Sequence, residues 1–331
     1  MLNPNAHLSP KLFQEDIDQA PTRKGYGEGL VVAGTEDEKV VVLCADLTVS
    51  TMSSLFRDKF PERFVEVGVA EQGMATIASG MANYGKIPFI SSYAAFSPGR
   101  NWEQIRTTIA LNNVPVKIAG AHAGISVGPD GATHQMLEDM ALMRAMPNMI
   151  VIAAGDAITA RKATAAAAKN GKPVYMRFAR EKTPIYTTDE TPFEIGKSLT
   201  LYESKSVQVG LIATGTLVYE ALLAAKLLDE SGIGSIVLDV HTVKPLDDDA
   251  VINVARKTGA IVTIEEHQIT GGLGGAVAEL LSRRHPTHQE YIGMPDHFGE
   301  SGEPNELLEK YGMKAHHIVD AAKKVIGRKN S

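Results

Sequence analysis

Residues 64–90 read FVEVGVAEQGMATIASGMANYGKIPFI, and this stretch decides the fold. A strand and its turn lead into the small and apolar residues of 70–84, whose spacing predicts a helix. A second short apolar run at 87–91 predicts the next strand. Strand, helix and strand in this order are typical of a parallel sheet covered by helices. Glu71 lies where the first strand and its turn feed the helix.

The same alternation extends over most of the chain. Before the polar stretch 181–197 we predict strands at 40–44, 114–118, 149–153 and 174–178, and helices at 102–111, 135–146 and 158–169. After it we predict strands at 207–213, 235–240 and 260–265, and helices at 217–229, 247–257 and 274–283. The predicted fold class is therefore α/β, with two domains, 1–190 and 191–331, each built on a largely parallel sheet flanked by helices.

Composition narrows the possible functions. With 44% hydrophobic and 22% charged residues over 331 positions, the chain is typical of a soluble globular protein. The net charge of −6 argues against a broad nucleic-acid surface. No apolar run approaches the ~18 residues that span a bilayer, and no signal pattern opens the chain. The single cysteine, Cys44, cannot form an internal disulfide, so we predict a cytoplasmic protein with no membrane or nucleic-acid partner.

Glu71 is the first candidate catalytic residue. Taken alone, a glutamate in a first helical turn is usually a favourable partner for the helix dipole. The surrounding VGVAEQGM, however, resembles the glutamate motif of transketolases and deoxyxylulose-phosphate synthases, which bind thiamine diphosphate. The resemblance implies that Glu71 hydrogen-bonds the cofactor's pyrimidine ring and promotes its activation. It also implies a pyrimidine-binding domain followed by a transketolase C-terminal-like domain.

Two further motifs follow the order of the same family. The run CADLTVSTMSS resembles its A-D-L-T-x-S segment, which implies that Asp46 and Leu47 lie beside the cofactor and Ser50 near a substrate phosphate. The run PTRKGYGEGL resembles its T-R-K segment, which implies a phosphate contact for Arg23. Each motif taken alone would fit strand-end capping or a solvated arginine.

An aromatic pair is the candidate for stacking on the cofactor. The stretch SSYAAFSPGRNWEQIR places Tyr93 and Phe96 three residues apart, although core packing is the commoner role of such a pair. Typical transketolases carry their stacking phenylalanines nearer to positions 87 and 90, whereas Phe96 fits the synthase pattern better. Both Tyr93 and Phe96 are therefore cofactor-binding candidates.

The substrate is expected to bind at a glycine-rich run and at an arginine beyond it. The run AHAGISVGPDGATHQMLEDM resembles the sugar-binding segment of transketolases, which implies that His122 contacts a phosphate, Asp130 a hydroxyl and His134 the carbonyl end of the donor. In PVYMRFAREKTP, Arg180 best matches the family's phosphate-binding arginine. Arg177 is the candidate for an ion pair at the domain boundary.

The second half resembles the last domain of the same family through HTVKPLDDD, TIEEHQITGGLGGAVAELL and HFGESGEPNELLEKYGM. Its glycine cluster could suggest a dinucleotide site, but Val277 stands where the third fingerprint glycine belongs. The family's diphosphate and metal signature, Gly-Asp-Gly with a later asparagine, has no counterpart, since Asp-Gly occurs only at 130–131. We therefore predict no metal ligands here and an N-terminal transketolase subunit that holds Mg²⁺ (or Ca²⁺) within an α2β2 heterotetramer.

These features together predict the C-terminal subunit of a split, thiamine-diphosphate-dependent transketolase. Such an enzyme moves a two-carbon ketol unit from a ketose phosphate to an aldose phosphate, as in the pentose phosphate pathway. Three alternatives stay open. One is the β subunit of a 2-oxo-acid dehydrogenase, which lacks the loop with His122, Asp130 and His134. The others are a deoxyxylulose-phosphate-synthase-like enzyme and a non-catalytic scaffold subunit, against which the retention of Glu71 argues.

Overall fold

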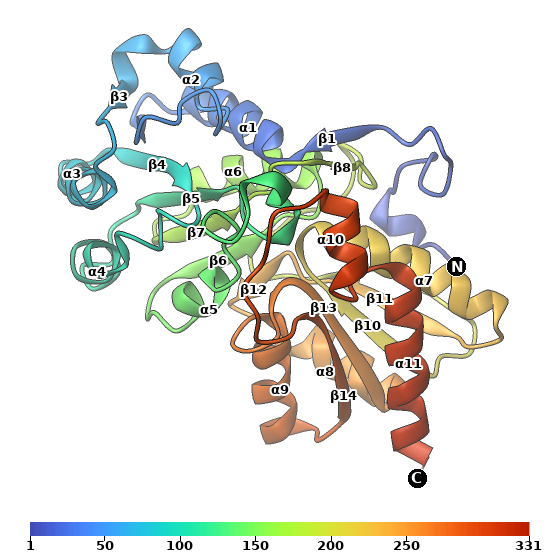
Figure 1. Cartoon of the computed structure of the whole chain (residues 1–331). Helices are drawn as coiled ribbons and strands as arrows, with labels where there is room; N and C mark the ends of the chain where they lie inside the picture. The colour runs from blue at the N-terminus through green and yellow to red at the C-terminus, as the bar shows by residue number, and fades with distance from the viewer. Residues whose placement is uncertain (331) are drawn as a thin grey trace.

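A seven-stranded sheet forms the first half of the molecule in the computed structural model, which describes residues 1–330 (Figure 1). Its strand order is β12-β6-β7-β5-β4-β2-β3. The strands are β2 (Val40–Cys44), β3 (Phe64–Glu66), β4 (Ile87–Tyr93), β5 (Lys117–Ala121), β6 (Ile150–Ala153), β7 (Val174–Arg177) and β12 (Thr242–Lys244). Every pairing is parallel except that of β12 with β6. The apolar run of β2 is buried at all five positions, as expected for a strand covered on both faces.

Helices cover both faces of this sheet. Core residues of α1 (Thr22–Glu36) and α6 (Ala157–Lys169) pack on one face. Those of α3 (Glu71–Asn83), the π-helical turn η3 (Ile105–Ala110) and α5 (Asp139–Arg144) pack on the other. The short helices α2 (Ser54–Lys59) and α4 (Trp102–Gln104) complete this half. The helices α1 and α6 approach closely because Gly25 has no side chain: a Cβ there would lie 1.9 Å from the Ala157 carbonyl oxygen.

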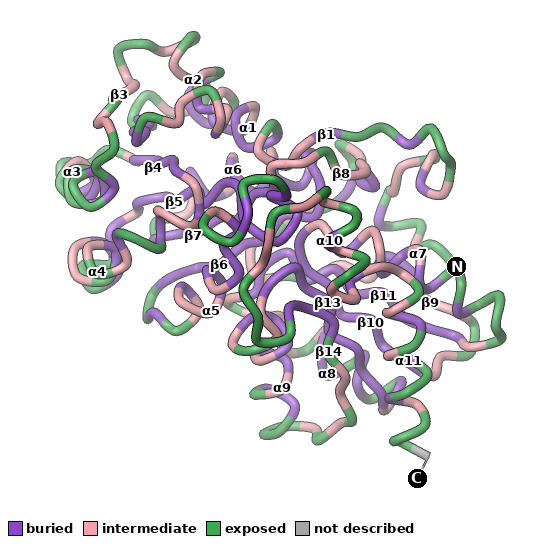
Figure 2. Tube along the Cα trace, viewed as in Figure 1, coloured by how far each residue is buried: buried purple, intermediate pink, exposed green. Residues whose placement is uncertain are grey.

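A five-stranded sheet organises the second half, in the order β14-β13-β10-β11-β9. The strands are β9 (Leu199–Glu203), β10 (Val209–Ala213), β11 (Ser235–Asp239), β13 (Ala260–Gln268) and β14 (His288–Met294), and β9 alone is antiparallel to its neighbour. The core on one face includes α7 (Val218–Glu230) and α11 (Ala315–Asn330), and that on the other α8 (Asp248–Thr258) and α9 (Leu273–Arg284). The short helix α10 (Pro304–Lys310) lies near the first half (Figure 1). Buried positions follow the strands of both sheets (Figure 2).

One strand pairing joins the two halves, and the stretch between them is ordered. Strand β12 follows β11 in the chain but pairs with β6 of the first sheet. The stretch predicted to be a polar linker is packed rather than loose: β8 (Lys182–Pro184) pairs with β1 (Gln19–Pro21), and the Tyr186 side chain is fully buried. The domain boundary near residue 190 stays a prediction.

The structure confirms the predicted α/β class with two mostly parallel sheets. Two element boundaries were wrong. The strand predicted at 114–118 is β5, three residues later, and the helix predicted at 135–146 is reduced to α5 because residues 131–138 belong to a loop and its turns. In the described chain, no helix has the length and apolar character needed to cross a membrane.

Candidate functional site

The candidate residues follow the carboxyl ends of neighbouring parallel strands. Asp46 comes two residues after β2, Tyr93 ends β4, His122 follows β5, and Arg180 lies just beyond β7. Parallel strands bring their carboxyl ends to one edge of the sheet, where ligands of α/β proteins usually bind. Segments widely separated in the sequence therefore meet at this edge.

Glu71 lies beside this edge, at the first residue of α3. Its side chain is only 1% exposed, and its Oε2 accepts a hydrogen bond of 2.7 Å from the Arg100 guanidinium. The Asn101 side chain donates to the Glu71 carbonyl, which fixes the start of the helix. The other carboxylate oxygen, Oε1, accepts no hydrogen bond from any residue in 1–330. The predicted strand, turn and helix around Glu71 are confirmed.

Four rings form one connected aromatic cluster. The Tyr93 ring stacks on the His122 imidazole with centroids 3.8 Å apart, and Phe96 stacks on Tyr93 at 5.9 Å. His134 meets the edge of Phe96 at 5.5 Å. The Arg100 guanidinium lies 4.7 Å from the Phe96 centroid, so one arginine joins the aromatic cluster to Glu71.

Positive charge gathers around His122. The Arg23 guanidinium donates 2.7 Å to the Ser50 carbonyl oxygen and lies 3.4 Å from His122 Nε2. Burial, followed by the charges of Arg23, Arg180 and His134, lowers the pKa of His122 to about 3. His122 is therefore a neutral hydrogen-bonding group near neutral pH, and the two arginines supply the charge. Arg23 has no carboxylate within ion-pair distance in residues 1–330, so the cluster is suited to an anion.

The basic cluster around His122 also contains buried polar atoms without hydrogen-bond partners. His122 Nδ1 and Arg23 Nε are buried and have no hydrogen-bond partner. Buried polar groups are nearly always paired, so two orphans in one cluster indicate a ligand that supplies the partners. Asp46 and Asp130 are exposed at the rim.

The remaining predicted residues make few contacts with the aromatic and basic clusters. Leu47 and Ser50 are half-buried, and Ser50 reaches Arg23 through its backbone carbonyl, not its hydroxyl. The Asp46, Ser50 and Asp130 side chains make no hydrogen bond or ion pair with another residue of the described chain. Any role for Asp46, Ser50 and Asp130 therefore depends on a ligand.

The loop that carries Asp130 is held from three sides. Its helical part, η4 (Ile125–Asp130), accepts a 2.8 Å hydrogen bond from Arg180 through the Val127 carbonyl. From the second half, the Glu266 carboxylate accepts a 2.6 Å bond from the Ser126 amide. Gln135 donates to the Glu300 carbonyl at 2.8 Å. The second half therefore supports the loop at which a sugar is predicted to bind.

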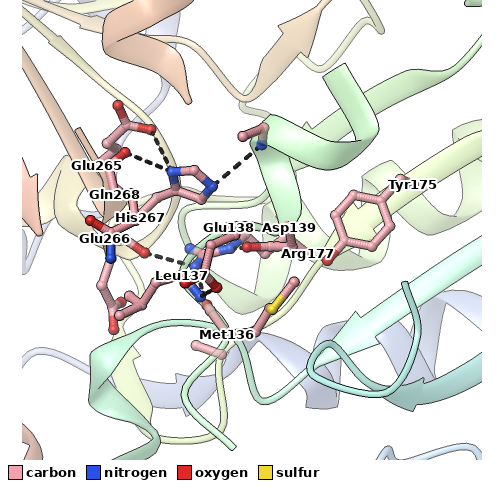
Figure 3. A network of polar contacts seen from close by, with 12 residues as sticks. Met136, Leu137, Glu138, Asp139, Tyr175, Arg177, Glu265, Glu266, His267 and Gln268 are labelled. Carbon is pink, nitrogen blue, oxygen red and sulfur yellow. Dashed lines mark hydrogen bonds and ion pairs between the residues drawn. The ribbon is translucent and has the colours of Figure 1, made fainter. Parts of the chain in front are cut away.

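Arg177, three residues before Arg180, belongs to a different network (Figure 3). Its Nε donates 2.8 Å to the Asp139 carboxylate, and its Nη2 donates to the carbonyls of Met136 and Glu266. Tyr175 donates to the same Asp139 oxygen at 2.7 Å. Asp139 and Arg177 are almost completely buried, so Arg177 joins the two halves as predicted for a boundary ion pair.

Strand β13 carries three consecutive buried polar side chains into this boundary. The Glu265 carboxylate accepts bonds from the Leu273 and Gly274 amides at the start of α9, so it occupies the helix N-terminus beside the glycine cluster. His267 donates from Nδ1 to the Gln268 carbonyl, and its Nε2 accepts from the Ala141 amide at 3.4 Å. The Glu265 and His267 side chains of β13 are buried, and their hydrogen bonds stabilise the fold.

Sequence reasoning missed Arg100 and Glu266. Arg100 contacts Glu71 across 29 residues of chain, and the sequence signal for it was a lone arginine four residues beyond Phe96. Glu266 lies in a strand where a charged residue would normally be expected at the surface. No sequence signal pointed to its contact with Ser126.

Comparisons with known proteins agree with this layout. The transketolase pyrimidine-binding domain model matches residues 18–185, and the transketolase C-terminal domain model matches residues 199–318. A "Putative transketolase C-terminal section" of Methanocaldococcus jannaschii is 44% identical over 90% of this chain and 93% of its own length. A "6-deoxy-6-sulfo-D-fructose transketolase subunit" of a Clostridium species is 39% identical over 96% of this chain and 98% of its own.

Solved structures and longer relatives give the same picture. A structure described as "Split gene transketolase, inactive beta4 tetramer" is 44% identical, with a TM-score of 0.87 over 93% of this chain and 99% of that chain. Transketolase-like protein 2 of Mus musculus is 37% identical over 93% of this chain, which spans 49% of that relative.

The fold and these similarities define the class: an α/β chain built of a transketolase pyrimidine-binding domain and a transketolase C-terminal domain. The chain belongs to the transketolase family and corresponds to the C-terminal section of a split transketolase. Membership of this family implies binding of thiamine diphosphate.

Proposed function

We propose that this chain is the pyrimidine-binding subunit of a two-subunit transketolase that moves a two-carbon ketol unit from a ketose phosphate to an aldose phosphate. One observation carries the proposal. The buried Glu71 carboxylate is joined through Arg100 to an aromatic cluster, which in turn contacts a basic cluster with unsatisfied polar atoms. A proton-handling group, a stacking surface and an anion site thus lie side by side.

The residues present fit the pyrimidine end of thiamine diphosphate. Glu71 offers the free Oε1 oxygen of a desolvated carboxylate to a ring nitrogen, and Phe96 or Tyr93 offers a flat surface. When bound, the cofactor supplies the electron sink for breaking a carbon–carbon bond. Glu71 would share a proton with the ring nitrogen, and its buried setting would keep water away from that proton. Asp46 and Leu47, which follow the carboxyl end of β2, are proposed to lie beside the same ring.

The basic cluster fits the anionic end of a sugar substrate. Arg23 and Arg180 supply positive charge, and neutral His122 offers Nδ1. Asp130 and His134 are proposed to contact hydroxyl and carbonyl oxygens closer to the reacting carbons. A sulfonate would satisfy the same donors as a phosphate, and one relative is named for a sulfo-sugar. We propose a sugar phosphate as the main substrate and a sulfo-sugar as the second candidate.

A separate subunit is needed for the diphosphate and its Mg²⁺ or Ca²⁺. In residues 1–330 the one convergent group of three potential metal ligands lies on α10 and α11, whereas Glu71 begins α3 on the opposite side of the molecule (Figure 1). Ile77 in α3 and Tyr84, the residue that follows this helix, are both exposed, with 44% and 92% of their surface accessible. Such exposed apolar side chains close to a site favour a protein interface. The relative described as an inactive β4 tetramer supports the view that the chain needs its partner, and an α2β2 assembly is the simplest closed form.

Product analysis tests the proposal. The chain is mixed with an N-terminal transketolase section, thiamine diphosphate and Mg²⁺, and is given a ketose phosphate labelled in its first two carbons plus an aldose phosphate. We expect label in a new ketose phosphate, and none when either protein is omitted. Release of CO₂ from a 2-oxo acid in place of ketol transfer would assign the chain to the dehydrogenase alternative. Absence of both reactions would favour a scaffold role.

A further inference from the structure

A second group of ligand-type side chains lies at the corner between α10 and α11. Glu309 is the second-last residue of α10, and His316 and His317 lie in the first turn of α11. Gly312, with φ of 73°, reverses the chain between the two helices. The corner therefore brings residues from two helices to one point at the surface.

The three side chains converge on one carboxylate oxygen. His316 Nε2 lies 3.0 Å from Glu309 Oε1, and His317 Nε2 lies 3.8 Å from the same oxygen. All three ligand atoms are within 4.8 Å of one another. The two imidazole rings lie close together and tilted, with centroids 3.9 Å apart and 38° between their planes. Both imidazoles therefore direct a ring nitrogen at the same carboxylate oxygen, an arrangement that one shared cation could occupy.

The neighbouring lysines do not form ion pairs with the Glu309 carboxylate, so it is available to a cation. Lys310 pairs with Glu300, and Lys314 with Glu220, so neither lysine is paired with the Glu309 carboxylate. Burial leaves His317 Nδ1 without a hydrogen-bond partner. No hydrogen bond therefore fixes which His317 nitrogen carries the proton, and the tautomer with a free Nε2 is accessible.

We propose that Glu309, His316 and His317 form a binding site for a transition-metal dication of the Zn²⁺ type. Two imidazoles and one carboxylate suit Zn²⁺, Co²⁺ or Ni²⁺, whereas Mg²⁺ and Ca²⁺ prefer all-oxygen ligands. Metal–ligand distances of about 2.0–2.2 Å in a tetrahedral site separate ligand atoms by roughly 3.3 Å. The observed separations of 3.0 and 3.8 Å lie on either side of that value. Water takes the fourth position, since the group is open to solvent.

A metal ion bound at this site would stabilise the position of the predicted sugar-binding loop through α10. The metal would tie α10 to α11, and α11 packs within the core of the second half. Pro304, the first residue of α10, lies against Gly128 of the loop, so closely that a Cβ on Gly128 would meet its Cγ at 3.0 Å. The site therefore acts on stability and on the position of the loop, and it plays no part in the chemistry at Glu71.

Metal titration of the chain alone tests the proposal, independently of any enzymatic activity. Chelator-treated protein is titrated with Co²⁺, followed by visible absorption, and with Zn²⁺, followed by calorimetry. We expect one equivalent to bind, with the intense absorption of tetrahedral Co²⁺, and Mg²⁺ not to compete. Zn²⁺ should raise the thermal midpoint by about 3 °C or more at a concentration a hundred times its Kd.

Variants locate the site. Glu309→Gln, His316→Gln and His317→Gln should each weaken binding at least tenfold, while His288→Gln, at an exposed histidine of β14, should leave it unchanged. The thermal midpoint of each metal-free variant shows whether its fold is intact; Glu309 and His316 are more than half exposed, so little change is expected. No binding by the wild type, or undiminished binding by the His316→Gln/His317→Gln double variant, would overturn the proposal.

Discussion

Two arginines near the end of β7 behave in opposite ways. Arg177 is 7% exposed, and its donors are taken by the Asp139 carboxylate and two backbone carbonyls. Arg180 is 30% exposed along its side chain and makes one hydrogen bond, to the Val127 carbonyl, beside a loose contact with Glu181. Both residues are arginines, one at the end of β7 and one three residues beyond it, but most donors of Arg180 make no hydrogen bond within residues 1–330.

At this edge of the sheet, the residues around Arg177 stabilise the fold, whereas those around Arg180 are available to bind a ligand. The boundary network around Arg177 leaves one buried atom, Asp139 Oδ1, without a hydrogen-bond partner. The basic cluster leaves two, Arg23 Nε and His122 Nδ1, and Arg23 has no carboxylate within ion-pair distance in residues 1–330. We therefore expect substitutions in the network to reduce stability and substitutions in the cluster to reduce function. The predictions below test this division, beginning with the largest effect.

Glu71→Gln should leave folding and partner assembly intact and reduce turnover by about 10²–10⁴-fold, because an amide cannot share a proton with the pyrimidine ring. Steady-state ketol transfer by the reconstituted enzyme measures this. Glu103→Gln, at an exposed acid on α4, is the matched control and should keep full activity. Activity of Glu71→Gln within about threefold of wild type would remove Glu71 from the mechanism.

Arg177→Met should lower the free energy of unfolding by about 3–5 kcal/mol, because it leaves the Asp139 carboxylate buried with only Tyr175 as its partner. Urea unfolding of the isolated chain provides the measurement. The double variant Arg177→Met/Asp139→Asn should recover part of the loss, since the unpaired charge is gone. An unchanged unfolding midpoint for Arg177→Met would show that the network does not stabilise the boundary.

Arg180→Ala should raise KM for phosphorylated donors by the equivalent of about 2–5 kcal/mol and have little effect on a short unphosphorylated donor. The reason is that the lost guanidinium contacts only the anionic end of the substrate. Arg256→Ala, at an exposed position of α8, is the control. Equal losses for both donor types would contradict the assignment.

His122 should make the smallest contribution, and it should depend on pH. Because its pKa is lowered to about 3 from an ordinary 6.5, the unfolded chain binds a proton between these values that the folded chain does not. The free energy of unfolding should therefore rise with pH across this window, by up to about 2 kcal/mol between pH 5 and pH 7. His122→Asn should flatten that part of the profile, as measured by urea unfolding at both pH values. An unchanged profile would contradict the buried neutral state.

Local patterns predicted much of the fold. The uniformly apolar run of β2 and the strand, turn and helix around Glu71 lie where the sequence indicates, because burial and periodicity act locally there. β12 was missed because it has three residues and pairs with a strand about ninety positions earlier. β5 was misplaced because it begins at the buried Lys117, whose ammonium donates to the carbonyls of Asn170 and Lys172, a compensation that sequence alone does not reveal.

The residues of the candidate site also separate into those that the sequence predicted and those that it missed. Family motifs and strand ends predicted the positions that gather around His122, since the order of parallel strands brings their ends together. Arg100 and Glu266 were missed because their partners, Glu71 and Ser126, lie 29 and 140 residues away. Such contacts arise from tertiary packing, which no short motif records.

Cofactor binding shows whether the thiamine diphosphate site is shared between this chain and a partner. Calorimetric titration with thiamine diphosphate and Mg²⁺ is performed on the chain alone, on an N-terminal transketolase section alone and on their equimolar mixture. We expect tight, stoichiometric binding only in the mixture. In the proposal, Glu71 and the aromatic cluster hold one end of the cofactor, and the diphosphate binds through a cation that the partner holds. Binding by this chain alone with the affinity of the mixture would contradict the claim.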